Sequence, residues 1–146
     1  MRRLGVAILL AAALPGAASA DLGGNWAKAS VAPARISAAS TLTFQLHYMM
    51  TCGQPAGAIT VRFPARMQLQ KTFGVRFGRL TISNVVVNGS TATFSIPRRG
   101  VTCMSIAPGT ATFVFSGIRN PARAGSYTLR AVAQNHDFST QLLVRA

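Results

Sequence analysis

Two neighbouring runs of alternating apolar and polar residues dominate the last third of the chain. Residues 110–117 read TATFVFSG and residues 126–133 read SYTLRAVA, with a turn rich in Asn, Pro and Gly between them. A period of two residues is that of a β-strand with one buried face. The pattern therefore predicts a strand–turn–strand unit. Its core-facing residues would be Phe113, Phe115, Tyr127 and Leu129.

The same period recurs elsewhere in the chain. From Leu42 to Tyr48 every second residue is apolar, which predicts a strand over 40–48 with one polar face. Residues 26–36 alternate less regularly and contain Pro33, which a sheet tolerates at its edge, so we predict an edge or broken strand there. Further strands are predicted at 58–63, 91–96 and 138–144.

Asn88-Gly89 is a strong hairpin signal between predicted strands at 80–87 and 91–96. The dipeptide favours the positive φ angles of a type I′ turn. A two-residue and a three-residue loop put different residues of the first strand inward, and both stay open, whereas Phe94 faces the core in either register. The tripeptide that starts at Asn88 also matches a glycosylation acceptor, for which the turn is the stronger interpretation.

The least regular stretch is 65–79. Apolar and basic residues mix there without a sustained period, and Gly74 and Gly78 argue against a long helix. We predict an irregular crossover that ends in a short strand near Val75 and Phe77, with a helix over its first half as the alternative.

Short strands separated by turn signals about every 8–12 residues, with no convincing helix, are typical of an all-β sandwich. The alternation suits antiparallel strands in two sheets packed face to face. We therefore predict one antiparallel β-sandwich domain of about 7–9 strands over residues 40–146, with residues 21–39 as a lead and edge strand.

The N-terminus has the three parts of a secretory signal peptide. Arg2 and Arg3 precede an apolar run from Leu4 to Leu14, and residues 18–20 form a small-residue cleavage site. The run is shorter than the roughly 20 apolar residues that span a bilayer, and no later stretch is longer. We predict a signal peptide over 1–20, cleaved after Ala20, and a secreted or extracytoplasmic protein without a transmembrane segment. An uncleaved N-terminal helix is the alternative.

The charge of the chain is strongly one-sided. Fifteen Lys and Arg residues stand against two acidic residues, so the formal net charge is +13, and +11 without Arg2 and Arg3. Such an excess favours anionic partners of many kinds, including cell-envelope phosphate polymers, acidic glycans and nucleic acid. No sequence-specific nucleic-acid motif is present, so sequence-specific binding of nucleic acid is not expected.

Cys52 and Cys103 are the two cysteines of the chain. In an exported protein such a pair predicts a disulfide, and closing a loop of this length would stabilise the fold by about 4 kcal/mol. The alternatives are a reactive thiol pair and a metal site, which lack the CxxC spacing or the further ligands that they need.

Candidate catalytic residues are few. The near-neutral bases are His47 and His136, and His136 is next to Asp137 in a predicted turn, where the two side chains would diverge. There is no GxSxG nucleophile elbow and no pair of carboxylates of the glycosidase kind. Two acidic residues are also too few for a calcium site. We therefore predict no catalytic, metal or cofactor site, and a protein that is not an enzyme.

Basic side chains are the remaining candidates for binding. The arginine guanidinium meets phosphate or carboxylate through two parallel hydrogen bonds, so exposed arginines suit an anionic polymer. The alternative is a solubilising surface without a partner. The candidate contacts are Arg62, Arg66, Lys71, Arg76, Arg79, Arg98, Arg99, Arg119 and Arg123.

Three segments resemble a known family. Residues 117–121 read GIRNP, residues 124–129 read AGSYTL, and residues 59–67 read ITVRFPARM. Together they resemble the immunoglobulin-like β-sandwich modules of secreted and surface-layer-associated prokaryotic proteins, over residues 40–146. The resemblance implies an immunoglobulin-like fold and a structural, adhesive or interaction role at or near the cell surface, rather than catalysis. The alternative, which rests on the basic charge, is a secreted binder of anionic polymers, so the candidate partners are another surface protein and an anionic cell-envelope polymer.

Overall fold

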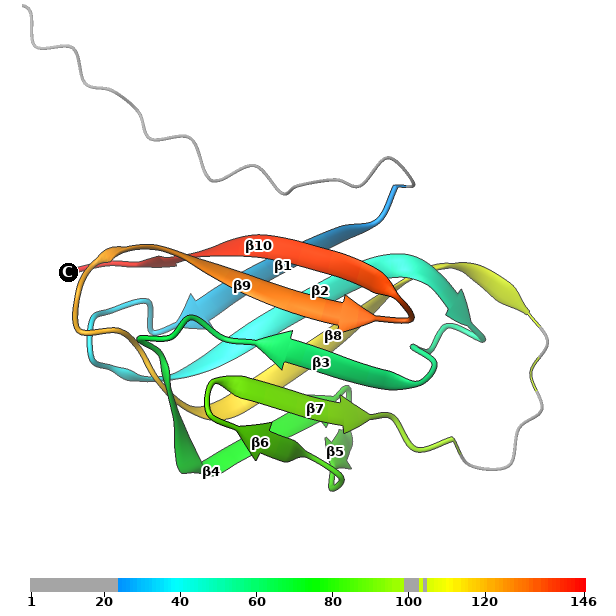
Figure 1. The fold of residues 1–146 in the computed structure, drawn as a ribbon, viewed down its shortest axis with the longest axis horizontal. Helices are drawn as coiled ribbons and strands as arrows, with labels where there is room; N and C mark the ends of the chain where they lie inside the picture. Colours follow the sequence, from blue (N-terminus) through cyan, green and yellow to red (C-terminus); the bar gives the residue numbers. More distant parts are fainter. Residues whose placement is uncertain (1–23, 99–102, 104) are drawn as a thin grey trace, which may run out of the picture.

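The computed structural model describes residues 24–98, 103 and 105–146. Within them, ten strands form two five-stranded antiparallel sheets that pack face to face (Figure 1). The described residues contain no helix, and thus none that is long and apolar enough to cross a membrane. The predicted all-β sandwich is confirmed, with more strands than expected. The predicted signal segment, residues 1–20, and Arg99 lie outside the described residues.

The two sheets are named sheet 1 and sheet 2. Sheet 1 has the order β1 (Trp26–Ala32), β2 (Ala39–Thr51), β8 (Ile106–Arg119), β4 (Gln68–Phe77) and β5 (Leu80–Ile82). Sheet 2 has the order β10 (His136–Val144), β9 (Gly125–Ala133), β3 (Ala58–Arg62), β7 (Thr91–Ser95) and β6 (Val86–Asn88).

Alternation along the strands builds the core between the sheets. In β2 the even-numbered residues over 42–50 are buried and the odd-numbered ones face outward. Aromatic rings then meet edge to face in the centre. The ring centroids of Phe63 and Phe115 are 5.4 Å apart, and those of Phe94 and Phe113 are 5.3 Å apart. Such pairs add about 0.5–1.5 kcal/mol each beyond the burial of their area.

The short strand predicted near Val75 and Phe77 is confirmed as the end of β4, whereas the irregular crossover predicted before it is wrong. Instead of an irregular crossover or a helix, the chain forms the extended strand β4 beside β8. The pairing register shifts between Leu69 and Gly74, which marks a bulge over 70–73. A bulge adds residues to one strand of a pair, so it interrupts the period of two from which a strand is predicted.

The strand predicted before the Asn-Gly turn is two strands. β5 pairs with β4 in sheet 1 and β6 pairs with β7 in sheet 2, so the chain changes sheets within residues 83–85. The hairpin itself is confirmed, with the two-residue loop Gly89-Ser90, because Asn88 pairs with Thr91. Of the two loop residues only Gly89 has a positive φ, 59°. This is the pattern of a type II′ turn, so the predicted type I′ turn is wrong.

The strand–turn–strand unit is confirmed, and its two strands lie in different sheets. β8 lies between β2 and β4 in sheet 1, whereas β9 lies between β10 and β3 in sheet 2. Leu129 is buried as predicted, and Tyr127 is half-buried against the core. The Tyr127 hydroxyl donates a 2.7 Å hydrogen bond to the carbonyl oxygen of Arg123, which holds the corner between the sheets.

The edge strands β1 and β10 contact each other along one side of the sandwich. The edge position predicted for the first strand is confirmed, and β1 ends just before Pro33. Beyond β1, the amide of Ile36 donates to the carbonyl oxygen of Arg145 at 2.9 Å. The amide of Arg145 in turn donates to the carbonyl oxygen of Ala34 at 2.6 Å. These bonds join the two sheets along this side.

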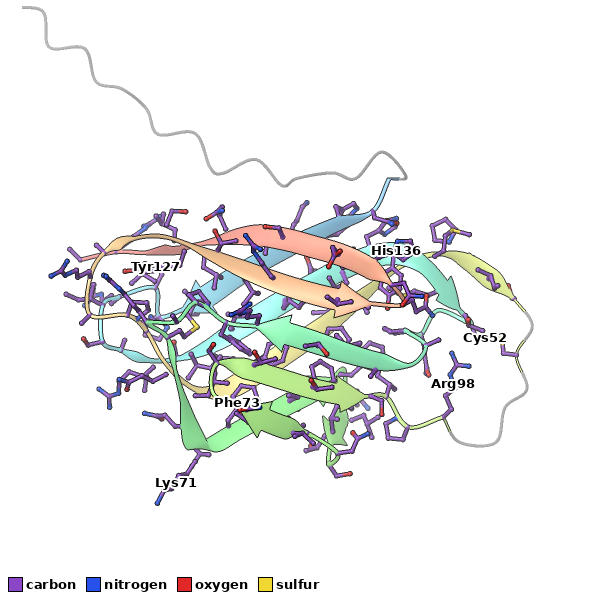
Figure 2. All side chains as sticks on the ribbon, in the orientation of Figure 1. Cys52, Lys71, Phe73, Arg98, Tyr127 and His136 are labelled. Atoms are coloured by element: carbon purple, nitrogen blue, oxygen red, sulfur yellow. A yellow bond between two sulfur atoms is a disulfide. The ribbon has the colours of Figure 1, made fainter. Side chains whose placement is uncertain are left out.

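The predicted Cys52–Cys103 disulfide is present. The two Cα atoms are 5.9 Å apart, within the usual range for a disulfide. The bond ties the residue that follows β2 to the segment that precedes β8, and Cys52 marks this end of the sandwich in Figure 2.

Candidate anion-binding site

Five exposed arginines lie at the end of the sandwich opposite the disulfide, where β1, β8 and β10 finish and β4 begins. This end carries the C-terminal residue in Figure 1. We name it the arginine end, and its members are Arg35, Arg66, Arg119, Arg123 and Arg145.

Buried Asn120 holds this end together. Its Nδ2 donates to the carbonyl oxygens of Pro33 and Arg35, both at 2.8 Å, and its Oδ1 accepts a 2.7 Å bond from the Ser40 hydroxyl. Its backbone amide donates to the carbonyl oxygen of Ala38 at 2.9 Å. The side chain thereby fixes the loop between β1 and β2 against the end of β8.

Three arginines meet around one shallow depression of about 390 Å³. A guanidinium nitrogen of Arg119, Nη1, donates to the carbonyl oxygen of Ser37 at 3.2 Å, and Arg119 is paired with Gln68 across the β8–β4 ladder. Arg66 precedes β4, and Arg123 follows β8 in the corner that Tyr127 holds. The lining residues are Ser37, Arg66, Gln68, Arg119, Asn120, Ala122 and Arg123.

Arg35 and Arg145 join this end through the backbone. They form an isolated parallel bridge beside the ends of β1 and β10. Neither was among the candidate contacts, because nothing in the sequence indicates that the two chain segments are neighbours. Predicting that Arg35 and Arg145 are neighbours would require knowing that β1 and β10 lie side by side in the sandwich.

The arginine end has no acidic side chain beside it in the described part of the chain. The one acidic side chain described is Asp137, near the start of β10, whereas Arg145 follows the end of the same strand. At about 3.3 Å per residue the strand separates the two by roughly 26 Å, well beyond a Debye length of about 8 Å at physiological salt. No acidic side chain of the described residues therefore offsets the charge of these arginines at close range.

The other predicted contacts do not join this group. Lys71, Arg76 and Arg79 are exposed along β4 and the turn that follows it, so the cluster predicted in the crossover is spread out. Arg98 lies at the disulfide end, and Figure 2 shows it far from Lys71. Arg99 lies outside the described residues.

Arg62 has a different neighbour. It lies directly opposite Arg130 on the outer face of sheet 2, and both side chains are exposed. Like charges directly opposite in a sheet destabilise it slightly, and a bound anion would offset the repulsion. The pair is a secondary contact for an anionic partner.

The candidate catalytic groups lie apart. His47 is on the outer face of sheet 1, where its ring stacks on Trp26, whereas His136 begins β10 and its ring centroid is 6.2 Å from that of Tyr48. Asp137 is the next residue of the strand, so the two side chains point to opposite faces, although they lie in a strand and not in the predicted turn. Among the described residues, no group of three or more His, Cys, Asp or Glu could hold a metal ion.

No protein-family model and no curated protein matches the sequence. Among solved structures, the fold is similar to that of BslA, described as a bacterial hydrophobin, with a TM-score of 0.51 and 15% identity over 81% of this chain and 98% of BslA. The N-terminal domain of the Streptococcus gordonii adhesin Sgo0707 matches with a TM-score of 0.48 and 13% identity, over 88% of this chain and 34% of that chain. At 15% identity the likeness to BslA establishes a common fold.

Proposed function

We propose that this protein is an exported, non-catalytic β-sandwich that binds an anionic polymer of the cell envelope through its arginine end. It would then have a structural, adhesive or interaction role at or near the cell surface. The observation that carries the proposal is the meeting of Arg66, Arg119 and Arg123 around one depression, with the described acidic side chain at the far end of β10.

We also propose that the sandwich is immunoglobulin-like. A constant-type immunoglobulin domain has the strand order A-B-E-D in one sheet and G-F-C in the other. If β1 to β4 are lettered A to D and β8 to β10 are lettered E to G, then β1-β2-β8-β4 and β10-β9-β3 follow these orders. The strands β5, β6 and β7 are then an insertion between D and E.

Tyr127 supports this assignment. Immunoglobulin-type sandwiches carry a tyrosine near the start of strand F whose hydroxyl bonds to the backbone a few residues upstream. Tyr127 lies near the start of β9, the strand in the F position, and bonds to the carbonyl of Arg123. The disulfide departs from the pattern, because Cys52 follows β2 and Cys103 precedes β8 instead of joining strands B and F.

The chemistry of the arginine end suits a polymer better than a small anion. Guanidinium groups bind phosphate or carboxylate through paired, charge-assisted hydrogen bonds, which are stronger than neutral ones. The depression is shallow, and Arg35 and Arg145 extend the charge past its rim. Repeated charges on one chain can therefore contact several guanidinium groups at once, and each contact releases counterions.

The test compares two triple variants of equal charge. Arg66→Ala/Arg119→Ala/Arg123→Ala removes the three arginines that line the depression, and Lys71→Ala/Arg76→Ala/Arg79→Ala removes three basic residues of β4 and its turn. Binding of the disulfide-bonded protein to fluorescent linear polyphosphate and to an acidic glycan is followed by anisotropy at low salt. The first variant should lose about tenfold or more in affinity and the second about threefold or less.

Equal losses for the two variants would mean that net charge acts without a site. Absence of binding by the unaltered protein to either polymer at low salt would overturn the proposed function altogether. Urea denaturation of both variants checks that the fold is retained, and all six substituted side chains are exposed.

A further inference from the structure

A second binding surface lies on the side of the sandwich where β1 meets β10. A shallow groove of about 430 Å³ crosses β1, where the residues Ala29 and Ser30 are small. One wall is formed by Thr43 and Gln45 of β2, and the other by Thr140 and Gln141 of β10. Lys28 completes the lining. Five of the seven lining residues therefore carry neutral side chains that form hydrogen bonds.

An aromatic platform adjoins this groove. Trp26 lies directly opposite His47 on the outer face of sheet 1, and the two rings stack with centroids 5.2 Å apart and planes 4° apart. The His47 ring is fixed by a 2.9 Å hydrogen bond between Nδ1 and the Thr110 hydroxyl. Lys28, which lines the groove, places its Nζ 4.8 Å from the centre of the Trp26 ring.

The register of β1 on β2 aligns these groups. Trp26 faces His47, Lys28 faces Gln45, and Ser30 faces Thr43, so they form three successive rows on one face. Each row is two residues from the next, about 7 Å along the strand. The stacked Trp26 and His47 rings, beside amide, hydroxyl and ammonium groups at this spacing, offer aromatic surface and a series of hydrogen-bond partners.

We propose that this groove binds a saccharide chain. A sugar ring has an apolar face of C–H groups that packs on an aromatic ring, and a rim of hydroxyls that need donors and acceptors. Gln45 and Thr43 supply both, and the Gln45 Nε2 also donates to the Thr112 hydroxyl at 3.3 Å, which orients the amide. A lipid or an apolar peptide offers these polar groups no hydrogen bonds in place of those to water. Lys28 can bond to a neutral hydroxyl or to the carboxylate of a uronate.

The proposal is independent of the arginine end. The groove shares no residue with that depression, and its binding does not require a charged ligand. Failure of polyphosphate binding would therefore leave saccharide binding intact, and the reverse also holds.

The single tryptophan of the chain makes the test direct, because all tryptophan emission comes from Trp26. Emission of the disulfide-bonded protein is titrated with soluble tetrasaccharides: cello-, chito-, manno- and malto-oligomers, and tetragalacturonate as the uronate arm. We expect a saturable change with at least one. Binding by neutral oligomers identifies a neutral glycan, and binding confined to the uronate, lost in Lys28→Met, identifies an acidic one.

Gln45→Leu and Thr43→Val are the site variants, since both substitutions suit a strand and keep Trp26 in place. Each should weaken binding about five- to tenfold, the value of one or two hydrogen bonds. Asn84→Ala, at an exposed residue outside both the groove and the arginine end, is the control and should leave saccharide affinity unchanged. No saturable change with any oligomer, or equal affinity in both site variants with their folds retained, would overturn the proposal.

Discussion

Gly117 marks a very close approach between β8 and the bulge of β4. Its φ is +67°, and a Cβ placed there would lie 2.5 Å from the backbone nitrogen of Phe73 and from the carbonyl carbon of Thr72. Backbone atoms cannot move away without disturbing the sheet. Glycine is therefore required at this position for two reasons: its φ is positive, and there is no room for a Cβ atom.

Gly117→Ala should lower the free energy of unfolding by on the order of 3 kcal/mol, because backbone displacement adds to the strain of a positive φ. Gly89→Ala is the matched control. Its φ is +59°, but no atom lies within 4 Å of its Cβ, so only the strain remains. This control should lose about 1 kcal/mol. Urea denaturation measures both, and equal losses would contradict the steric explanation.

Tyr48 combines a buried ring with a hydroxyl that finds no hydrogen-bond partner among the described residues. Burial raises the pKa of Tyr48 from 10.0 to about 12. Below pH 10 the hydroxyl keeps its proton in the folded and the unfolded chain. Between about pH 10 and 12 only the unfolded tyrosine ionises, so the free energy of unfolding falls over that window.

Tyr48→Phe should remove this loss. At pH 8 the variant should equal the unaltered protein or exceed it by about 1 kcal/mol, since an unpaired buried hydroxyl is removed. At pH 11 its advantage should grow by about 1 kcal/mol more. Urea denaturation of both proteins at the two pH values gives the difference. An advantage that is independent of pH would show that Tyr48 ionises normally in the folded chain.

At the scale of elements, Asn120 joins β8 to the loop between β1 and β2. Asn120→Ala would leave the carbonyl oxygens of Pro33 and Arg35 and the hydroxyl of Ser40 without their side-chain partner. We expect the free energy of unfolding to fall by about 3 kcal/mol. The control is Asn84→Ala. The Asn84 amide is exposed and bonds to one side chain, that of Ser95, so this variant should lower the free energy of unfolding by less than about 1 kcal/mol. Similar losses would show that the network contributes little.

The elements that the sequence predicts well are those with an uninterrupted period of two. Residues 42–50 of β2 and the strands on either side of the Asn-Pro turn are examples, because one face of each is buried throughout. The first part of β4 was missed because the bulge over 70–73 breaks the period. The division into β5 and β6 was missed because residues 80–88 contain no turn signal strong enough to mark a change of sheet. Both failures arise from contacts between strands that are distant in sequence.

At the scale of the whole molecule, the sequence predicts the excess of positive charge but not its arrangement. Arg66, Arg119 and Arg123 were candidates together with six residues that lie elsewhere or outside the described residues. Arg35 and Arg145 were not candidates. Their position depends on the pairing beside β1 and β10, and that of Arg66 depends on the register of β4 on β8. The groove beside Trp26 likewise depends on the contact between β1 and β10.

Exposed apolar side chains lie on both sheets, and Met49 and Ile106 are diagonal neighbours across the β2–β8 ladder. Val86, Val132 and Leu143 lie on sheet 2, whereas Met49 and Ile106 lie near the disulfide end of sheet 1. Scattered exposed apolar residues are ordinary on soluble protein surfaces. The feature that distinguishes the arginine end is therefore its charge.

The salt dependence of polyanion binding tests the arginine end most directly. The logarithm of the affinity for linear polyphosphate is measured against the logarithm of the salt concentration for the unaltered protein and both triple variants. For a single-stranded polyanion, the slope of this plot becomes shallower by about 0.7 for each phosphate contact that is removed. We predict that the slope becomes shallower by about 2 in Arg66→Ala/Arg119→Ala/Arg123→Ala. It should hardly change in Lys71→Ala/Arg76→Ala/Arg79→Ala, and the same change in both variants would contradict a site at the arginine end.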